Sequence, residues 1–152
     1  METPRARVRQ LRLVVEADDY DAAVRFYRDV LGMTELAAFA EGGDDRVAIL
    51  EAGAATLEIA SPAHKVTIDR VEGVAEETPG LRVAFQVDDA AAVVDDLAAA
   101  GARVIAVPVL TPWHSMNARL DAPAGLHITV FQETLDRHER TRQEGFTTDD
   151  RR

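Results

Sequence analysis

Two histidines and a glutamate are the residues of this chain best suited to chemistry. His114 and His127 lie on neighbouring segments of the second half, and Glu58 lies in an apolar stretch of the first half. Two imidazoles and one carboxylate form a ligand set that binds a divalent transition metal and leaves positions open. Without a metal, His127 or Glu58 could act as a general acid or base, because a buried imidazole or carboxylate can be tuned for proton transfer near neutral pH. Both chemistries are compatible with the residue types.

The only tryptophan, Trp113, follows a proline in a loop of the second half. An aromatic side chain at the mouth of a pocket stacks on planar ligands, although a loop tryptophan can equally pack on a core or dimer surface. The chain has no cysteine, no Ser-His-Asp order, no phosphate-binding glycine loop and no dinucleotide fingerprint. These absences exclude a disulfide framework, thiolate chemistry and the common nucleotide-binding loops.

The charge balance restricts the possible partners. The 152 residues include 27 acidic and 17 basic side chains, which gives a net charge of −10. Such a chain repels nucleic acid and anionic membranes and attracts a cationic small molecule, or is acidic simply to stay soluble. No apolar segment has the length of a signal peptide or a membrane span. We therefore expect a cytoplasmic protein that binds neither nucleic acid nor membrane.

Two segments with the same pattern position these residues. In the first, alternating apolar residues run to Val15, Asp18-Asp19 cap a helix with apolar residues every three or four positions, and Gly32 ends it. The second segment has the same order, with Asp88-Asp89 as the cap and Gly101 as the end. Chance explains one such pattern more easily than two in the same order. The repetition predicts a duplicated module.

Each predicted helix is followed by three strand-like segments, so each copy is a β-α-β-β-β unit. These strands are predicted at 33–40, 46–51 and 55–60, and again at 103–109, 116–120 and 126–131. The predicted divisions are a first module over 1–61, a linker loop over 62–80, a second module over 81–131 and a charged helix or tail over 132–152. The fold class is therefore α+β.

Two motifs resemble a known family. The sequence from Ala23 to Gly32 has the spacing A-x-x-F-Y-x-x-x-L-G, and Asp121 to Gly125 resembles a D-P-x-G turn. Both are similar to signatures of the vicinal oxygen chelate superfamily, which includes glyoxalases, extradiol dioxygenases, epimerases and bleomycin-resistance binding proteins. The resemblance covers roughly Val8 to Phe131. It implies two tandem βαβββ modules whose curved mixed sheet surrounds a cavity, and a homodimer, but it leaves the activity open.

The resemblance also implies where a metal would bind. Enzymes of the superfamily use four inward-facing strand positions, two in each module, to present His and Glu ligands. By register, these positions are Gln10, Glu58, Arg82 and Thr129. Only Glu58 is an ordinary ligand, and Arg82 cannot lose its proton to become one. The resemblance therefore implies a site with no metal or other cofactor, in which Glu58 and Arg82 form an ion pair across the cavity.

Strand alternation adds residues to the same face. Arg12, Gln86 and His127 each lie an even number of residues from one of the four positions, so their side chains point the same way. With the loop residues Trp113 and His114 they complete a predicted ligand-binding set. That set is Gln10, Arg12, Glu58, Arg82, Gln86, Trp113, His114, His127 and Thr129. The apolar residues between them should pack beneath the helices.

Two functions follow. The first is a metal-free protein of the glyoxalase/bleomycin-resistance type that binds a planar or cationic small molecule, such as an antibiotic or secondary metabolite. The second is a metal-dependent lyase, isomerase or dioxygenase with a non-standard ligand set that includes Glu58 and a histidine. No catalytic residue is assigned. A cavity within one chain and a cavity shared across a homodimer are both compatible with the pattern.

Overall fold

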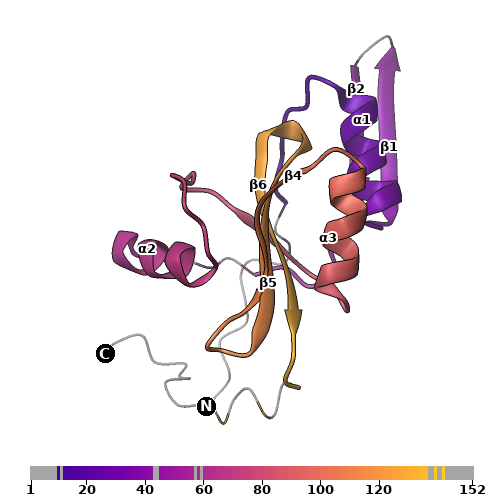
Figure 1. The fold of residues 1–152 in the computed structure, drawn as a ribbon. Coiled ribbons are helices and arrows are strands. Elements are labelled where there is room, and N and C mark those ends of the chain that lie inside the picture. Colours follow the sequence, from indigo (N-terminus) through magenta and orange to yellow (C-terminus); the bar gives the residue numbers. More distant parts are fainter. Residues whose placement is uncertain are drawn as a thin grey trace, which may run out of the picture. The chain divides into compact units, whose positions relative to one another are not determined.

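The computed structural model describes residues 10, 12–42, 45–56, 58, 60–136, 139 and 142. The chain divides into two compact units, Met1–Ala60 and Ser61–Arg152 (Figure 1). Helices and small β-sheets occur in both units, which confirms the predicted α+β class. Among the described helices, none combines the length and the apolar character that a bilayer span requires.

The first unit begins with the predicted capped helix. The Asp19 side chain accepts a hydrogen bond from the backbone N–H of Ala22 at 3.0 Å and so caps α1 (Tyr20–Val24). The helix continues as a π-helix, η1 (Arg25–Val30), in which Phe26 and Tyr27 are buried and meet edge to face, 5.0 Å between ring centroids. Burial raises the pKa of Tyr27. Gly32 follows with a φ of 91°, the left-handed conformation that ends a helix.

Two of the four strands predicted for the first unit are present. β1 (Glu35–Gly42) and β2 (Asp45–Leu50) pair antiparallel. The ends of both strands lie within two residues of their predicted limits. The strand predicted before the helix is absent from the described residues: residues 12–15 form no strand, Val14 is 87% exposed, and no described strand of this unit pairs with them. Residues 55, 56, 58 and 60 also form no strand, and residues 57 and 59 of that prediction lie outside the described part.

The second unit has the complete βαβββ order. It consists of β3 (Val83–Gln86), α3 (Ala90–Ala99), β4 (Arg103–Leu110), β5 (Ser115–Ala122) and β6 (Leu126–Glu133), with a single 3-10 turn, η2 (Pro123–Gly125), between the last two strands. The four strands form one sheet in the order β3-β6-β5-β4, in which β3 runs parallel to β6 and the other pairs are antiparallel. The sequence prediction of these elements is confirmed.

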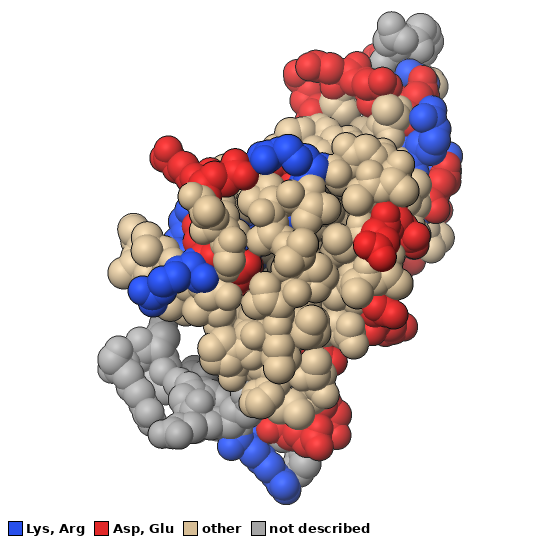
Figure 2. All heavy atoms as spheres, viewed as in Figure 1, with Lys and Arg blue, Asp and Glu red and all other residues tan. Residues whose placement is uncertain are grey.

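Side-chain alternation gives this sheet an apolar face and a polar face. On the apolar face, Leu120, Ile128 and Val130 are fully buried, as is Leu97 of α3, which packs against the sheet. Acidic side chains gather on the exposed side of α3, whereas the surface around β4 and β5 is largely uncharged in the view of Figure 2. The apolar core predicted beneath the second helix is therefore present.

The linker differs from its predicted form. Residues 62–80 were expected to be a loop, but α2 (Pro62–Val71) occupies half of them. Ser61 caps this helix by accepting a hydrogen bond from the N–H of His64 at 3.2 Å, and Pro62 stands at the first helical position, where its missing N–H costs nothing. Figure 1 shows α2 on the opposite side of the four-stranded sheet from α3.

Candidate functional site

The polar face of the second unit brings together the largest group of buried polar side chains in the described part of the chain. Strands β5 and β6 are in register so that Arg119 pairs with Thr129 and Asp121 pairs with His127. Because residues directly opposite on neighbouring strands point to the same side, these four side chains share one face. Asn117 joins them two residues before Arg119. We call these five residues the polar face.

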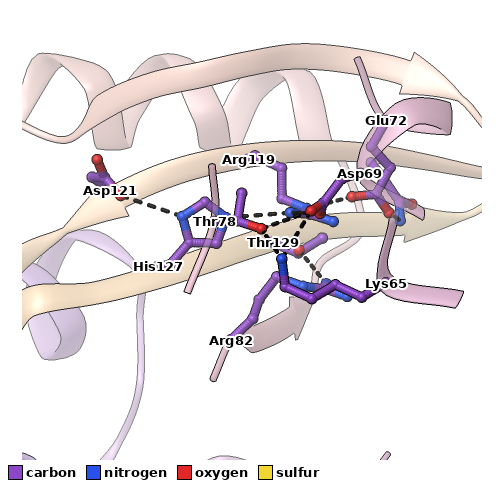
Figure 3. A network of polar contacts seen from close by, with 10 residues as sticks. Lys65, Asp69, Glu72, Thr78, Arg82, Arg119, Asp121, His127 and Thr129 are labelled. Carbon is purple, nitrogen blue, oxygen red and sulfur yellow. Dashed lines mark hydrogen bonds and ion pairs between the residues drawn. The ribbon is translucent and has the colours of Figure 1, made fainter. Parts of the chain in front are cut away.

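Arg119 is the centre of the polar face and is only 1% exposed. Its Nε donates to the carboxylate of Glu72, which is equally buried, and its Nη1 donates to Asp69 at 2.9 Å (Figure 3). Asn117 Nδ2 donates to the second oxygen of Glu72 at 2.7 Å. The guanidinium is therefore neutralised by two carboxylates that both belong to the linker segment, not to the sheet.

The contacts of His127 fix its tautomer. Its Nε2 lies 3.2 Å from Arg119 Nη1, and its Nδ1 lies 3.3 Å from Asp121 Oδ1. An arginine can only donate, so Nε2 must accept and the proton must be on Nδ1, from which it is donated to Asp121. The lone pair that a metal would need is directed at a guanidinium. His127 is therefore a buried structural partner of Arg119 in this arrangement.

Two carboxylates of the network have lowered pKa values. Burial of Asp69 opposes its ionisation, but hydrogen bonds from Thr78 at 2.6 Å, Lys65 at 3.1 Å and Arg119 outweigh it and lower the pKa. Asp121 behaves in the same way: hydrogen bonds from Arg103 at 2.5 Å and from His127 outweigh its burial. Both carboxylates are therefore held in their charged form.

The Asp69 shift predicts how stability depends on pH. Because its pKa is lower in the folded chain than its ordinary value of 3.8, Asp69 stabilises the fold above about pH 4, and this contribution is lost as the pH falls through the folded pKa. We expect Asp69→Asn to be less stable than the wild type at pH 7, with a difference that shrinks on acidification. Urea unfolding at several pH values measures this difference in the free energy of unfolding. The control is Asp95→Asn, which changes an exposed carboxylate on α3 and should keep the pH dependence of stability of the wild type. A loss of stability in Asp69→Asn that stays constant from pH 7 to pH 2 would contradict the expectation.

Two of the four positions that the resemblance implied as metal ligands are in contact. Arg82 Nη1 donates to Thr129 Oγ1 at 2.5 Å, and Thr129 is completely buried. Gln10 and Glu58 belong to the first unit and are exposed; Gln10 accepts a hydrogen bond from Arg12 Nε at 3.2 Å. The ion pair between Glu58 and Arg82 joins residues of different units and stays a prediction.

The remaining predicted residues lie along the same sheet. Gln86 Nε2 donates to Glu133 at 3.4 Å. Trp113, 36% exposed, and His114, with a φ of 63°, form the turn between β4 and β5. Ser115 pairs with Glu133, whereas Asp121 pairs with His127, so the two histidines stand at opposite ends of β5, on the order of 20 Å apart.

That separation corrects the hypothesis that His114 and His127 bind one ion with Glu58. His114 and His127 lie on neighbouring segments of the sequence, but the length of the extended strand β5 separates their side chains. Within the described residues, no three His, Asp or Glu side chains are placed to hold a metal. The positions implied by the family do not fit a divalent cation either, because a guanidinium and a threonine hydroxyl replace two ligands.

The sequence prediction missed the buried residues Asn117, Arg119 and Glu72 and the half-buried Asp69. A signal for the first two existed. In the strand predicted at 116–120, polar Asn117 and Arg119 alternate with apolar Ala118 and Leu120, which places them on the polar side. No local signal marks Glu72, which reads as an ordinary surface acid.

Comparisons with known proteins agree with this fold. The family model described as the Glyoxalase/Bleomycin resistance protein/Dioxygenase superfamily matches residues 9–130. A comparison with curated proteins found no match.

Several solved structures are similar in fold. TnmS3, an antibiotic binding protein from Streptomyces sp. CB03234, is 24% identical with a TM-score of 0.55 over 86% of this chain and 100% of that chain. A protein of unknown function from Agrobacterium tumefaciens is 23% identical with a TM-score of 0.51, over 84% and 98%. A glyoxalase-related enzyme from Fulvimarina pelagi is 16% identical with a TM-score of 0.51, over 83% and 89%. At these identities the likeness concerns the fold alone. The signatures around Phe26 and Asp121, the βαβββ order of the second unit and the family match over residues 9–130 agree, and the chain belongs to the glyoxalase/bleomycin resistance/dioxygenase superfamily, also called the vicinal oxygen chelate superfamily.

Proposed function

We propose that this protein binds a planar small molecule without a metal ion, as the bleomycin-resistance members of the superfamily do. The observation that supports the proposal most is the contact between Arg82 and Thr129. At two positions where the family's enzymes present metal ligands, a guanidinium donates to a hydroxyl at 2.5 Å. Neither group is an imidazole or a carboxylate, and an arginine repels a cation at that place.

We further propose that the ligand contacts the predicted ligand-binding set, including its residues on the four-stranded sheet. Trp113 and Arg82 lie toward opposite ends of the four-stranded sheet, so a ligand that reaches both must be extended. An antibiotic or another secondary metabolite with fused rings has that shape. The antibiotic binding protein TnmS3 has a similar fold, which supports this ligand class.

A homodimer in the cytoplasm is part of the proposal. Strand β4 is an edge of the four-stranded sheet and exposes Val107 and Leu110, which are 68% and 59% accessible. Exposed apolar side chains on an edge strand are typical of surfaces that associate. Sedimentation analysis of the chain measures the oligomeric state, and a monomer at all concentrations would exclude the homodimer.

Ligand binding predicts a rise in the melting temperature. A ligand at 100 times its Kd stabilises the folded chain by about 2.7 kcal/mol, or roughly 5–10 °C for a domain of this size. We expect at least one compound in a panel of planar aromatic metabolites to produce such a shift, and Trp113→Ala to abolish it because the stacking surface is lost. Phe39→Ala, which removes an aromatic residue exposed on β1, is the matched control. A full shift in Trp113→Ala would remove Trp113 from the site.

Metal analysis after exhaustive dialysis tests the other part of the proposal. We expect much less than one equivalent of metal per chain. One equivalent of tightly held Fe, Mn, Ni or Zn would contradict a metal-free site and would favour a metal-dependent lyase, isomerase or dioxygenase. In that case Glu58→Gln should lose the metal, because Glu58 is the one ordinary ligand among the four implied positions.

A further inference from the structure

The charges that meet at the polar face come from two different places. The sheet side supplies the cations: Arg119 from β5, and Arg82, which donates to Thr129 of β6. Two carboxylates neutralise Arg119, those of Asp69 and Glu72. Both come from the segment formed by α2 and the turn after it (Figure 3). The carboxylate of the polar face itself, Asp121, is bound at the edge by Arg103 and His127. Without the α2 segment, the guanidinium of Arg119 would lose both carboxylates that neutralise it.

The pairing of Arg119 is incomplete. Its Nε donates to Glu72 and its Nη1 to Asp69, each through a single contact, while the buried Nη2 has no hydrogen-bond partner among the described residues. A guanidinium binds a carboxylate most strongly when two parallel N–H groups meet both oxygens. Glu72 does not make that arrangement, because its second oxygen accepts from Asn117. An unused donor therefore remains in the interior.

The α2 segment is held mainly by these charges. None of the residues Pro62–Val71 is buried, and Val66 on this helix is 66% exposed. Among the described residues, its contacts to the sheet are polar: the ion pairs of Asp69 and Glu72 with Arg119 and, further beyond the helix, the surface pair of Glu76 with Arg103. A segment that buries little apolar surface opens at a lower free-energy cost than one in the core. Lifting α2 from the sheet would return its carboxylates to water and expose little apolar surface.

We propose that Glu72 is an internal substitute for a ligand carboxylate, and that the ligand of this protein is a planar organic anion. In the closed form the α2 segment covers the polar face, and the carboxylate of Glu72 accepts the hydrogen bond from Arg119 Nε. A ligand carboxylate displaces Glu72, pairs with Nε and Nη2 of Arg119 together, and lies on the same face as Arg82. This inference rests on the proposed function and specifies the charge of the ligand. The net charge of −10 attracts cations from a distance, but the two groups that the ligand carboxylate would approach on this face, Arg119 and Arg82, are cationic.

Three probes with one ring system and different charges test the proposal: 1-naphthoate, 1-naphthamide and 1-naphthylmethylammonium. Their affinities for the full chain are measured by isothermal titration calorimetry. We expect naphthoate to bind at least ten times more tightly than the other two. Glu72→Gln, which removes the competing charge but keeps the shape, should tighten naphthoate binding by about tenfold more, because less is needed to open the α2 segment. Glu76→Gln removes an exposed glutamate that pairs with Arg103 at the surface, where an ion pair contributes little, so it should change the affinity far less than Glu72→Gln does.

A measurement on the wild type covers the case in which Glu72→Gln fails to fold. Naphthoate should accelerate hydrogen exchange of the amides of α2, and naphthamide at the same concentration should not. If naphthylmethylammonium or naphthamide binds as tightly as naphthoate, the protein binds small molecules but the anionic assignment is wrong. Equal naphthoate affinities for Glu72→Gln and Glu76→Gln, or unchanged α2 exchange on binding, would overturn the role of Glu72. Failure of all three probes and of the aromatic panel would overturn the proposed function as well.

Discussion

Arg119→Met is expected to destabilise the second unit by about 3–5 kcal/mol, since it removes the guanidinium that, among the described residues, pairs with Glu72 and so leaves a buried carboxylate without its opposite charge. Methionine has a similar length and can fill the space, so packing contributes little to the loss. Asp69 keeps its hydrogen bonds from Lys65 and Thr78, which confines the effect largely to Glu72.

Urea unfolding followed by Trp113 fluorescence measures this loss, because the single tryptophan reports on the second unit. Arg103→Met is the matched control: Arg103 pairs with Glu76 and Asp121 at the surface, where ion pairs contribute much less. A combined Glu72→Met and Arg119→Met variant should recover most of the stability, because an apolar pair replaces a buried ion pair. A loss for Arg119→Met as small as that for Arg103→Met would show that the pair contributes little.

Local patterns predicted the second unit well. Asp89 accepts a hydrogen bond from the N–H of Ala92 at 3.0 Å, as its position before an apolar helix indicated, and Gly101 ends that helix with a φ of 104°. Alternation in β6 placed Thr129 and Ile128 on opposite faces. Caps, helix periods and strand alternation each involve residues a few positions apart, so a single sequence contains them completely.

The missed features depend on partners distant in the chain. Arg119 and Glu72 are 47 residues apart, and neither has a neighbour in sequence that signals the pairing. The helix α2 has its start signal in Ser61-Pro62, but its weak apolar pattern favoured a loop. The segment predicted as a strand near Val15 has suitable alternation, but no strand among the described residues of its unit pairs with it. Pairing between distant segments, rather than local preference, decided these cases.

The candidate site shows the same division. The resemblance assigned Arg82 and Thr129 to one site, and the parallel pairing of β3 with β6 brings them into contact, but the predicted partner of Arg82 was Glu58 and the contact with Thr129 was not predicted. The pairing of His114 with His127 was wrong, since proximity in sequence does not imply proximity along an extended hairpin. What the sequence could not indicate is that the polar face is covered by a segment of the linker.

Glu72→Ala is expected to lose about 3–5 kcal/mol of stability, and part of that loss should return when acetate is added. The substitution leaves Arg119 buried with Nε and Nη2 both without a carboxylate, and it opens a space of about the size of the missing group. Acetate carries the same carboxylate group as the glutamate side chain and is about the size of the space that the substitution opens. A ligand that binds only the folded chain stabilises it by RT ln(1 + [L]/Kd), which is about 1.4 kcal/mol at ten times Kd.

Thermal or urea unfolding of Glu72→Ala across an acetate series, with ionic strength held constant by chloride, measures the recovery. Acetamide, which is the same size and neutral, should restore little, because the attraction at Arg119 is to an oxyanion. Glu76→Ala should show no specific response to acetate, since its partner Arg103 is exposed to solvent. Recovery with acetamide equal to that with acetate would mean that the space, not the charge, limits stability. Recovery with acetate alone would mean that Arg119 accepts an external carboxylate in place of Glu72, as binding of an anionic ligand at the polar face requires.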